Sequence, residues 1–409
     1  MIYGLIGEHL GHSFSAAIHG QIGPEPYELL ELEPEQLEPF LRERKFRGIN
    51  VTIPYKQAVI PCLDGISDTA REIGAVNTIV NREGRLLGDN TDLAGMAKLI
   101  LRVCPDPEGM KTLVLGTGGT SKTAAYTAKM LGAGPVIRVS RTAREDAVSY
   151  GDALRNHRDA ELIINTTPCG MYPRTEEAPL DLEGFGRLRG VADAVYNPLR
   201  TKLVLQAKGK GIPAEGGLYM LVAQAVRAAE IFRNTEYPAE LTEQIYRKLM
   251  KEKENIVLTG MPGSGKSAVT AALADITGRT AADTDRMITE KAGMPIPEIF
   301  RKYGETYFRD LESEVIRGLA PMGGQIISTG GGAVLRRENV EALRMNGRLY
   351  MLDRPLEELL PTDDRPLADS REKIEGLYQA RMPVYRSTAD EVIPVRGTPE
   401  EVARAIVRS

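Results

Sequence analysis

The sequence predicts an α/β protein of more than one domain, in which helices cover largely parallel sheets. Its 409 residues exceed what one ordinary hydrophobic core organises. Short runs rich in aliphatic and β-branched residues alternate along the chain with amphipathic helical stretches, a rhythm typical of parallel sheets with helical crossovers. The expected strands lie at residues 2–7, 27–32, 48–53, 112–116, 136–140, 162–166, 255–260, 325–330 and 349–353.

The composition excludes several classes of protein. Hydrophobic residues make up 42% and charged residues 26%, as in globular proteins, and the 41 glycines and 25 prolines follow no collagen-like period. A net charge of -4 provides no overall positive field, so we expect neither nucleic acid nor a membrane surface as a partner. Three scattered cysteines and the lack of an apolar run of about 18 residues indicate a reduced, cytoplasmic location without export or membrane anchoring. The oligomeric state stays open.

Two changes in local pattern predict the domain organisation. Residues 237–254 are strongly helical and charged, and a new strand starts directly afterwards at Asn255. The stretch PDPEGMK at residues 105–111 breaks any helix before the strand that follows it. We therefore expect a first lobe from residues 1–104 and about 218–250, a second lobe from residues 105–217, a linker at residues 251–254 and a last domain at residues 255–409.

The strongest local signal is the run GMPGSGKS at residues 260–267, between an apolar strand and an alanine-rich helix. A G-x-x-x-x-G-K-S pattern lets backbone N–H groups curl around phosphates, while its lysine adds a positive charge and its serine hydroxyl ligates Mg2+. The run predicts a site for ATP and Mg2+ formed by Pro262, Gly263, Ser264, Gly265, Lys266 and Ser267.

Charged residues downstream predict how the phosphate acceptor is held. Asp283 and Asp285 are two apart, so if this run is extended both carboxylates face one side and can divide two duties, one at the metal and one at the acceptor hydroxyl; we expect Asp283 at the metal. Arg309 and Glu312 are three apart on a helix, where the acid can hold the guanidinium in a pose suited to a carboxylate substrate.

Further groups follow in the same domain. Three consecutive glycines at residues 330–332 follow a strand and let a ligand approach the backbone closely. Arg365 and Arg381 supply two more cations. For each of these charged residues alone, an ordinary surface ion pair is the commoner explanation. The order in which they occur together favours a substrate-binding site.

The order GMPGSGKS, DTD, FRDLE, STGGGA, RPL and ARMPVY resembles the shikimate kinase family over essentially all of residues 255–409. The resemblance implies a P-loop kinase domain with the parallel sheet of nucleoside-monophosphate kinases. It implies catalytic roles for Lys266, Asp285 and Arg365, the last on a lid over ATP. The residues implied to bind the substrate are Asp285, Arg309, Gly331 and Arg381.

The lid departs from that family. The segment between Leu352 and Arg365 is shorter and more acidic than usual, and the stretch from Arg365 to Arg381 is also trimmed. A nucleotide-monophosphate or gluconate-type kinase shares the phosphate loop, but the DTD, FRDLE and GGG set favours a carboxylated cyclohexene as the acceptor.

A second glycine-rich loop, LGTGGTS at residues 115–121, follows a strand and opens a helix, so a helix N-terminus is available for a pyrophosphate. About 20 residues on, where an NAD site carries an acidic residue, this sequence has a serine and two arginines. Two cations suit a 2'-phosphate and favour NADP(H), although a pair of arginines on a solvated turn is the alternative. The expected cofactor residues are Gly116, Thr117, Gly118, Gly119, Thr120, Ser140, Arg141 and Arg144.

Polar clusters mark the first lobe: HSFS at 12–15, NVTIPYK at 50–56, GAVNT at 74–78 and GDNTD at 88–92. Ser13 and Ser15, two apart on an extended segment, can grip one carboxylate. Lys56 with Asp92 suits carbonyl reduction, because an ammonium stabilises the negative charge that grows on the ketone oxygen and can donate the proton. A structural ion pair is the alternative for this couple.

Together with LGTGGTS, SRT, INTTPCGMYP, DAVYNP and GGLYMLVAQA, these clusters resemble the shikimate dehydrogenase family over about residues 1–235. The resemblance implies a two-lobed dehydrogenase with a Rossmann NADP-binding domain and with Lys56 and Asp92 as the catalytic pair. Ala194 and Gly217 then lie near the nicotinamide. The other residues implied to contact the substrate are Ser13, Ser15, Thr52, Asn77, Tyr196 and Gln224.

Two departures from that family are small. Ala16 stands where a proline usually follows the second serine, and Ser140 replaces the usual asparagine before Arg-Thr. We expect modest effects on substrate posture and NADP affinity.

The two resemblances name successive steps of one route toward chorismate and the aromatic amino acids. They imply a bifunctional enzyme that reduces 3-dehydroshikimate to shikimate with NADPH and then phosphorylates shikimate to shikimate 3-phosphate with ATP and Mg2+. The alternative is a broader quinate/shikimate dehydrogenase joined to a weakly active or regulatory kinase-like module.

Overall fold

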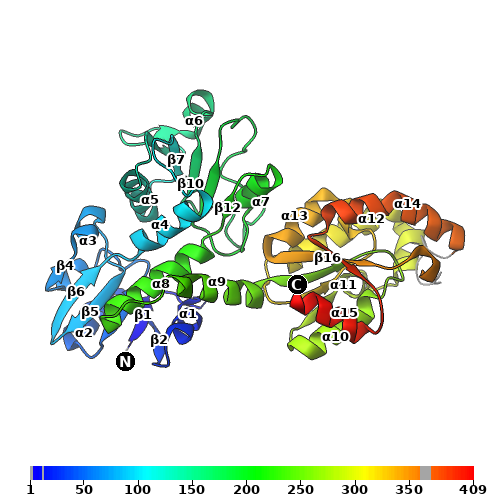
Figure 1. The fold of residues 1–409 in the computed structure, drawn as a ribbon, viewed down its shortest axis with the longest axis horizontal. Helices are drawn as coiled ribbons and strands as arrows, with labels where there is room; N and C mark the ends of the chain where they lie inside the picture. Colours follow the sequence, from blue (N-terminus) through cyan, green and yellow to red (C-terminus); the bar gives the residue numbers. More distant parts are fainter. Residues whose placement is uncertain (1–2, 12, 360–369) are drawn as a thin grey trace. The chain divides into compact units, whose positions relative to one another are not determined.

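The computed structural model describes residues 3–11, 13–359 and 370–409. It divides into two compact units, the first formed by Met1–Asn197 with Leu203–Leu249 and the second by Pro198–Lys202 with Met250–Ser409. Helices surround sheets in both units (Figure 1). The expected linker at residues 251–254 consists of the last residues of helix α9 (Glu240–Lys253) and Glu254, directly before β13 (Asn255–Thr259).

The first sheet of unit 1 has the strand order β2-β1-β3-β5-β6-β4. β1 pairs in parallel with β2 and β3, whereas the β3–β5 and β5–β6 ladders are antiparallel. The β5–β6 hairpin turns through Glu83 and Gly84 at φ 52° and 84°, the twist that a two-residue hairpin loop requires. The strands are β1 (Tyr3–Gly7), β2 (Tyr27–Glu31), β3 (Gly48–Val51), β4 (Gly65–Ile66), β5 (Thr78–Arg82) and β6 (Arg85–Asp89), accompanied by helices α1 (Ser15–Ile22), α2 (Pro34–Glu43) and α3 (Asp68–Ile73).

The second sheet of unit 1 has the order β12-β11-β10-β7-β8-β9 with parallel ladders throughout. The chain builds outward from β7 through β8 and β9 and then returns to β10 on the other side, so the carboxyl end of β7 is a topological switch point, where ligands bind in open α/β sheets. The strands are β7 (Thr112–Leu115), β8 (Val136–Ser140), β9 (Val148–Ser149), β10 (Leu162–Asn165), β11 (Gly190–Asp193) and β12 (Ala214–Glu215), with helices α5 (Gly119–Met130), α6 (Tyr150–Asn156) and α7 (Lys202–Gly209).

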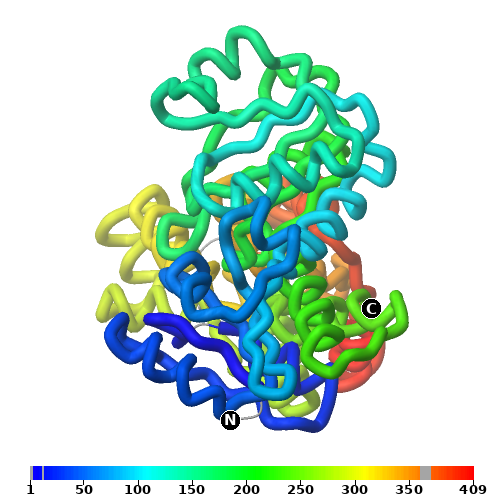
Figure 2. The backbone as a smooth tube through the Cα atoms, turned by 90° about the vertical axis from the view of Figure 1, so that its left-hand side faces the viewer, coloured from blue at the N-terminus to red at the C-terminus, as the bar shows by residue number. Residues whose placement is uncertain are grey.

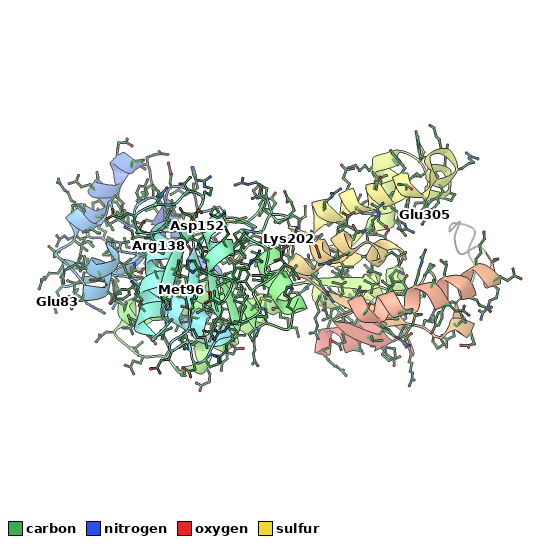
Figure 3. The ribbon with its side chains drawn as sticks, turned by 90° about the horizontal axis from the view of Figure 1, so that it is seen from above. Glu83, Met96, Arg138, Asp152, Lys202 and Glu305 are labelled. Atoms are coloured by element: carbon green, nitrogen blue, oxygen red, sulfur yellow. The ribbon has the colours of Figure 1, made fainter. Side chains whose placement is uncertain are left out.

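Helices α4 (Asp92–Val103) and α8 (Leu218–Arg233) pack against each other and join the two lobes of unit 1. Figure 2 shows the blue segments of the first sheet and the teal segments of the second as separate lobes. Met96 of α4, labelled in Figure 3, is fully buried in a cluster that also contains Met220 of α8. A Cβ at Gly95 would lie 2.7 Å from the Met220 carbonyl oxygen, so glycine is what permits this close approach.

The sheet of unit 2 has the order β14-β15-β13-β16-β17, and its ladders are parallel. Its remaining strands are β14 (Ala281–Asp283), β15 (Ile326–Ser328), β16 (Gly347–Asp353) and β17 (Glu391–Pro394). The helices are α10 (Lys266–Thr277), α11 (Thr284–Ala292), α12 (Ile296–Leu319), α13 (Arg337–Asn346), α14 (Arg371–Thr388) and α15 (Pro399–Arg408), with a short 3-10 turn η2 (Ala333–Leu335). The carboxyl ends of β13, β14 and β15 meet at one edge of this sheet and lead into the predicted kinase residues.

The α/β class is confirmed, and each strand expected from the sequence is present. The β5–β6 hairpin was not expected, and only its ends, at Thr78 and at Gly88 and Asp89, fall in the polar clusters GAVNT and GDNTD. In the part of the chain that the structure describes, no helix is both long enough and apolar enough to cross a bilayer.

Candidate active sites

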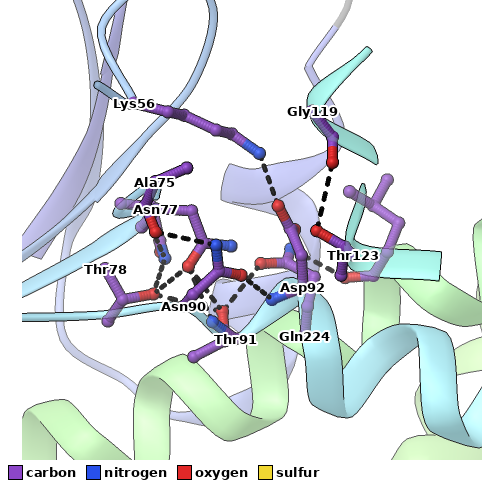
Figure 4. Close-up of polar contacts among 12 residues, drawn as sticks. Lys56, Ala75, Asn77, Thr78, Asn90, Thr91, Asp92, Gly119, Thr123 and Gln224 are labelled. Atoms are coloured by element: carbon purple, nitrogen blue, oxygen red, sulfur yellow. Dashed lines mark hydrogen bonds and ion pairs between the residues drawn. The ribbon is translucent and has the colours of Figure 1, made fainter. Parts of the chain in front are cut away.

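Lys56 and Asp92 form an ion pair with 2.6 Å between Nζ and Oδ2 (Figure 4). Lys56 follows β3 in an irregular segment, and Asp92 is the first residue of α4. Their side chains are 29% and 19% exposed, so the pair is shielded on one side yet open to a ligand. A carboxylate in the first turn of a helix is favoured by the helix dipole, which adds to the attraction of the lysine.

A buried hydrogen-bond network holds Asn77 and Gln224 beside this pair (Figure 4). Asn77 Oδ1 accepts from the Thr91 backbone N–H at 2.8 Å and from the Thr78 hydroxyl at 3.0 Å. Thr91 Oγ1 lies 3.3 Å from Gln224 Oε1, which links the GDNTD segment to α8. Thr78 and Thr91 were missed by the sequence analysis, although both stand next to predicted residues in GAVNT and GDNTD.

The two serines of HSFS do not lie on an extended segment, so that expectation is wrong. Phe14 has helical backbone angles, Ser15 begins α1, and the Ser13 hydroxyl accepts from the Ser15 backbone N–H at 3.2 Å. Tyr196 packs on Phe14 with ring centroids 5.5 Å apart, which brings it to the serine segment, and burial raises the pKa of Tyr196. Thr52 lies just after β3, where its backbone N–H donates to the Ile6 carbonyl.

The loop of residues 116–120 runs from the carboxyl end of β7 into α5, at the switch point of its sheet. Gly116 has φ +114°, and a Cβ there would lie 2.7 Å from Thr166 Oγ1. A Cβ at Gly118 or Gly119 would meet nothing within 4 Å, so this surface is open to a pyrophosphate. Nearby in sequence, Ser140 is buried at the end of β8, while Arg141 and Arg144 are exposed.

Gly217 and Ala194 touch through their backbones. A Cβ at Gly217 would lie 2.1 Å from the Ala194 carbonyl oxygen, and the Gly217 N–H donates to the Val195 carbonyl. The structure thus brings together the two residues that were placed near the nicotinamide, and only glycine permits their contact.

The second site is a cavity of about 710 Å3 in unit 2. Lys266 Nζ donates to the carbonyl oxygens of Gly260 and Met261 at 2.9 and 3.0 Å. Gly263 and Gly265 have φ +79° and +94°, which explains the glycines of the phosphate loop. The predicted residues that line the cavity are Pro262, Gly263, Ser264, Gly265, Lys266, Ser267, Asp283, Asp285, Arg309, Gly331 and Arg381, whereas Arg365 lies outside the described residues.

The expectation that Asp283 and Asp285 share an extended run is wrong. Asp283 ends β14 and caps α11, accepting from the Arg286 N–H at 3.1 Å, and Asp285 lies in the first turn of that helix. Both still line the cavity. No cluster of three or more His, Cys, Asp or Glu residues that could hold a metal occurs in the described ranges. The Ser267 hydroxyl and the Asp283 carboxylate fit Mg2+, because this ion is usually held by one or two protein ligands, nucleotide phosphates and water.

The other end of the cavity is built around Arg309 and Glu312, whose Nη1 and Oε2 atoms lie 2.8 Å apart. Burial raises the pKa of Glu312, while the Arg309 guanidinium acts in the opposite direction. A Cβ at Gly332 would lie 2.1 Å from Arg309 Nη1, and one at Gly330 would lie 2.6 Å from Asp285 Oδ1. These glycines therefore make room for the charged side chains themselves, in addition to any ligand.

Tyr385 is a further residue at this end, and the sequence analysis did not single it out. Its hydroxyl donates to the Gly331 carbonyl oxygen, which also accepts from Arg381 Nη1 at 3.2 Å. Burial raises the pKa of Tyr385 to about 12, so the hydroxyl keeps its proton. The signal was present in ARMPVY, where Tyr385 follows Arg381 by one helical turn.

Comparisons with known proteins agree with both family resemblances. A family model described as "Shikimate kinase" matches residues 262–409, and one described as "Shikimate dehydrogenase substrate binding domain" matches residues 5–79. A shikimate dehydrogenase (NADP(+)) of Clostridium perfringens is 37% identical over 266 residues, which cover 61% of this chain and 98% of that protein.

Solved structures extend this likeness to the fold. A shikimate 5-dehydrogenase from Thermus thermophilus, in complex with NADP(H) and shikimate, has a TM-score of 0.55 at 32% identity and covers 61% of this chain and 99% of its own. A quinate dehydrogenase from Corynebacterium glutamicum, in complex with NAD, has a TM-score of 0.55 at 26% identity and covers 61% and 98%. The chain belongs to the shikimate dehydrogenase family and carries, fused behind that part, a shikimate kinase domain.

Proposed function

We propose that this chain reduces 3-dehydroshikimate to shikimate with NADPH in unit 1 and phosphorylates shikimate to shikimate 3-phosphate with ATP in unit 2. The observation that carries the proposal is the presence in one chain of both families, each with its polar site assembled: the Lys56–Asp92 pair at 2.6 Å and the Lys266 cavity of about 710 Å3. The product of the first reaction is the substrate of the second.

In unit 1, the loop of residues 116–120 with Arg141 and Arg144 would hold NADPH, which would supply the hydride for reduction of the carbonyl carbon of the substrate. The Lys56 ammonium stabilises the negative charge that develops on the carbonyl oxygen and donates the proton that completes the alcohol. Asp92 holds the Lys56 Nζ in place. Asn77 and Gln224, which are fixed by their contacts with Thr91, form hydrogen bonds with the ring hydroxyls of the substrate. Ser15, the first residue of α1, and Ser13, two residues before it, bind the carboxylate.

In unit 2, Arg309 and Arg381 hold the substrate carboxylate and Asp285 orients the acceptor hydroxyl. Lys266 and the backbone N–H groups of the phosphate loop stabilise the charge on the transferring phosphoryl group. Ser267 and Asp283 would hold Mg2+ at the nucleotide phosphates, where the ion neutralises negative charge.

Product analysis of the intact protein tests this function. With 3-dehydroshikimate, NADPH, ATP and Mg2+, we expect shikimate 3-phosphate, and omission of ATP should stop the sequence at shikimate. NADPH oxidation without a phosphorylated product would reject the kinase half. Faster turnover of quinate with NAD than of shikimate with NADP+ would favour the quinate dehydrogenase alternative.

The choice of NADP(H) depends on Arg141 and Arg144 in this proposal. The double variant Arg141→Ala/Arg144→Ala should raise the KM for NADPH by about tenfold to a hundredfold, because each arginine provides charge-assisted hydrogen bonds to the 2'-phosphate. The KM for NADH should change by less than about threefold, because NADH lacks that phosphate. Steady-state kinetics with both cofactors measures the difference, and an equal loss with NADH would show that the arginines serve something other than the 2'-phosphate.

Gly332 provides a test of substrate binding in the kinase domain. Its φ of -107° tolerates alanine, but the added Cβ would clash with Arg309 Nη1, so that Gly332→Ala should displace the guanidinium. We expect the KM for shikimate to rise about tenfold while the KM for ATP stays within about twofold. Gly318→Ala, in α12 with nothing within 4 Å of the new Cβ, is the matched control. A rise in the KM for ATP alone would contradict the placement of Arg309.

A further inference from the structure

Arg138 in β8 connects three segments of the dehydrogenase unit. Its Nη2 donates to the Thr117 carbonyl at 2.9 Å, its Nε donates to Ser121 Oγ at 3.2 Å, and its Nη1 forms an ion pair with Asp146. The Arg138 side chain, labelled in Figure 3, is only 13% exposed. The guanidinium is therefore committed to protein groups and does not itself offer a free surface to a ligand.

Two of these contacts act on the dinucleotide loop. Ser121 stands where a third glycine is common, and its buried hydroxyl donates to the Gly116 carbonyl at 2.6 Å while accepting from Arg138 Nε. Arg138 on the neighbouring strand thus holds Thr117 and Ser121 directly, and Ser121 in turn holds Gly116. Such ties reduce the conformational freedom that the loop would lose on binding a pyrophosphate.

The third contact reaches the segment expected to take the 2'-phosphate. After β8 the chain makes a tight turn in which the Arg144 N–H donates to the Ala147 carbonyl at 2.8 Å and the Ala147 N–H donates back at 3.3 Å. Asp146 is at the tip of this turn, two residues from Arg144, and its carboxylate pairs with Arg138. Left unpaired, that carboxylate would place a negative charge in the segment where the 2'-phosphate is expected.

We propose that Arg138 is a positioning and specificity residue for the cofactor of the dehydrogenase. It fixes the pyrophosphate loop and the Arg144 turn relative to each other, and its charge offsets that of Asp146. The site therefore favours a dinucleotide that carries a 2'-phosphate as well as the pyrophosphate. This inference rests on the proposed NADPH-dependent function of unit 1. It gives a largely buried side chain of β8 a part in cofactor selection, in addition to the loop glycines and the exposed Arg141 and Arg144.

The test compares NADPH and NADH binding to the full-length protein, by fluorescence titration, in Arg138→Met, Asp146→Asn and the double variant. We expect Arg138→Met to weaken NADPH binding at least about tenfold and NADH binding less than about threefold, since only the first cofactor meets the freed carboxylate. Adding Asp146→Asn should restore NADPH binding about threefold, because it removes the repulsion but not the lost ties. Equal weakening of both cofactors without recovery would mean a merely structural role and would overturn the proposal.

Controls separate this inference from the proposed function. The control substitution Arg155→Met removes an arginine of the same lobe whose side chain is 70% exposed and pairs with Asp152. This variant should bind both cofactors as tightly as the parent protein does. Thermal melting reports on the fold of each variant, and Arg138→Lys replaces the methionine variant if that one melts early. A lysine keeps the charge opposite Asp146, so it should retain most of the NADPH preference. If the parent protein reduces 3-dehydroshikimate with NADPH and Arg138→Met binds NADPH as tightly as the parent does, this inference alone is overturned. If the parent protein binds no NADPH, the proposed function is overturned.

Discussion

Replacing Lys56 with alanine is expected to slow NADPH-dependent reduction of 3-dehydroshikimate by about 10^3-fold, because the proton donor and the charge that stabilises the developing oxyanion are both lost. The effect should fall mainly on kcat, since the residues proposed to bind the substrate, Ser13, Ser15, Asn77 and Gln224, are unchanged. Phosphorylation of shikimate by the same preparation should be unchanged. Stopped-flow absorbance of NADPH and a coupled kinase assay measure the two rates.

Lys45→Ala is the matched control for this variant, because Lys45 is in the same lobe but is largely exposed and pairs with Glu43. It should reduce the ketone at the parent rate. If Lys56→Ala kept more than about a tenth of the parent rate, Lys56 would be a structural ion-pair partner of Asp92 and another group would supply the proton. Loss of both activities with the fold intact would contradict two independent sites.

Lys266→Ala is expected to lower phosphorylation of shikimate by about 10^2-fold to 10^3-fold, because it removes the buried positive charge that we propose acts on the phosphoryl group being transferred. Its own surroundings support that role: Nζ is held by two carbonyl oxygens of the phosphate loop and lines the cavity. Reduction of 3-dehydroshikimate should proceed at the parent rate. Product analysis should therefore show shikimate accumulating where the parent protein makes shikimate 3-phosphate.

The control for the second variant is Lys291→Ala in α11, a half-exposed lysine of the same unit that pairs with Glu314 at 2.6 Å. It should leave phosphorylation within about twofold of the parent, as expected for a surface ion pair. Normal phosphorylation by Lys266→Ala would remove the phosphate loop from the mechanism. Loss of the reductase in that variant would indicate that the substitution damages more than one site.

Local motifs could be recognised from the sequence because their residues are neighbours in the chain. The glycines of GMPGSGKS occupy backbone conformations with positive φ, and the run leads directly into a helix, so the phosphate loop is specified within eight residues. The strand and helix pattern likewise identified the α/β class. Two local expectations failed where a helix begins early: Ser15 and Asp285 are in first turns of helices, although their short polar runs were expected to be extended.

Contacts between distant segments could not be predicted in the same way. Thr91 and Gln224 are separated by 133 positions, and Arg138 contacts Thr117 and Ser121 in the dinucleotide loop and Asp146 in the turn after β8. Nothing in the sequence says that Gly332 must make room for Arg309 or that the Tyr385 hydroxyl holds the Gly331 carbonyl. Each contact depends on how strands and helices pack, and many sequences with the same motifs could pack differently.

By itself, then, the sequence determined the class of fold, both family resemblances and most of the residues expected to touch ligands, because backbone conformation and chemical type are encoded locally. The tertiary structure alone decided how those residues are held: the Asn77 network, the close approach at Gly217 and the Arg138 ties. The physical reason is that a hydrogen bond or an ion pair forms only when packing brings its two partners within about 3 Å, and packing is a property of the whole folded unit.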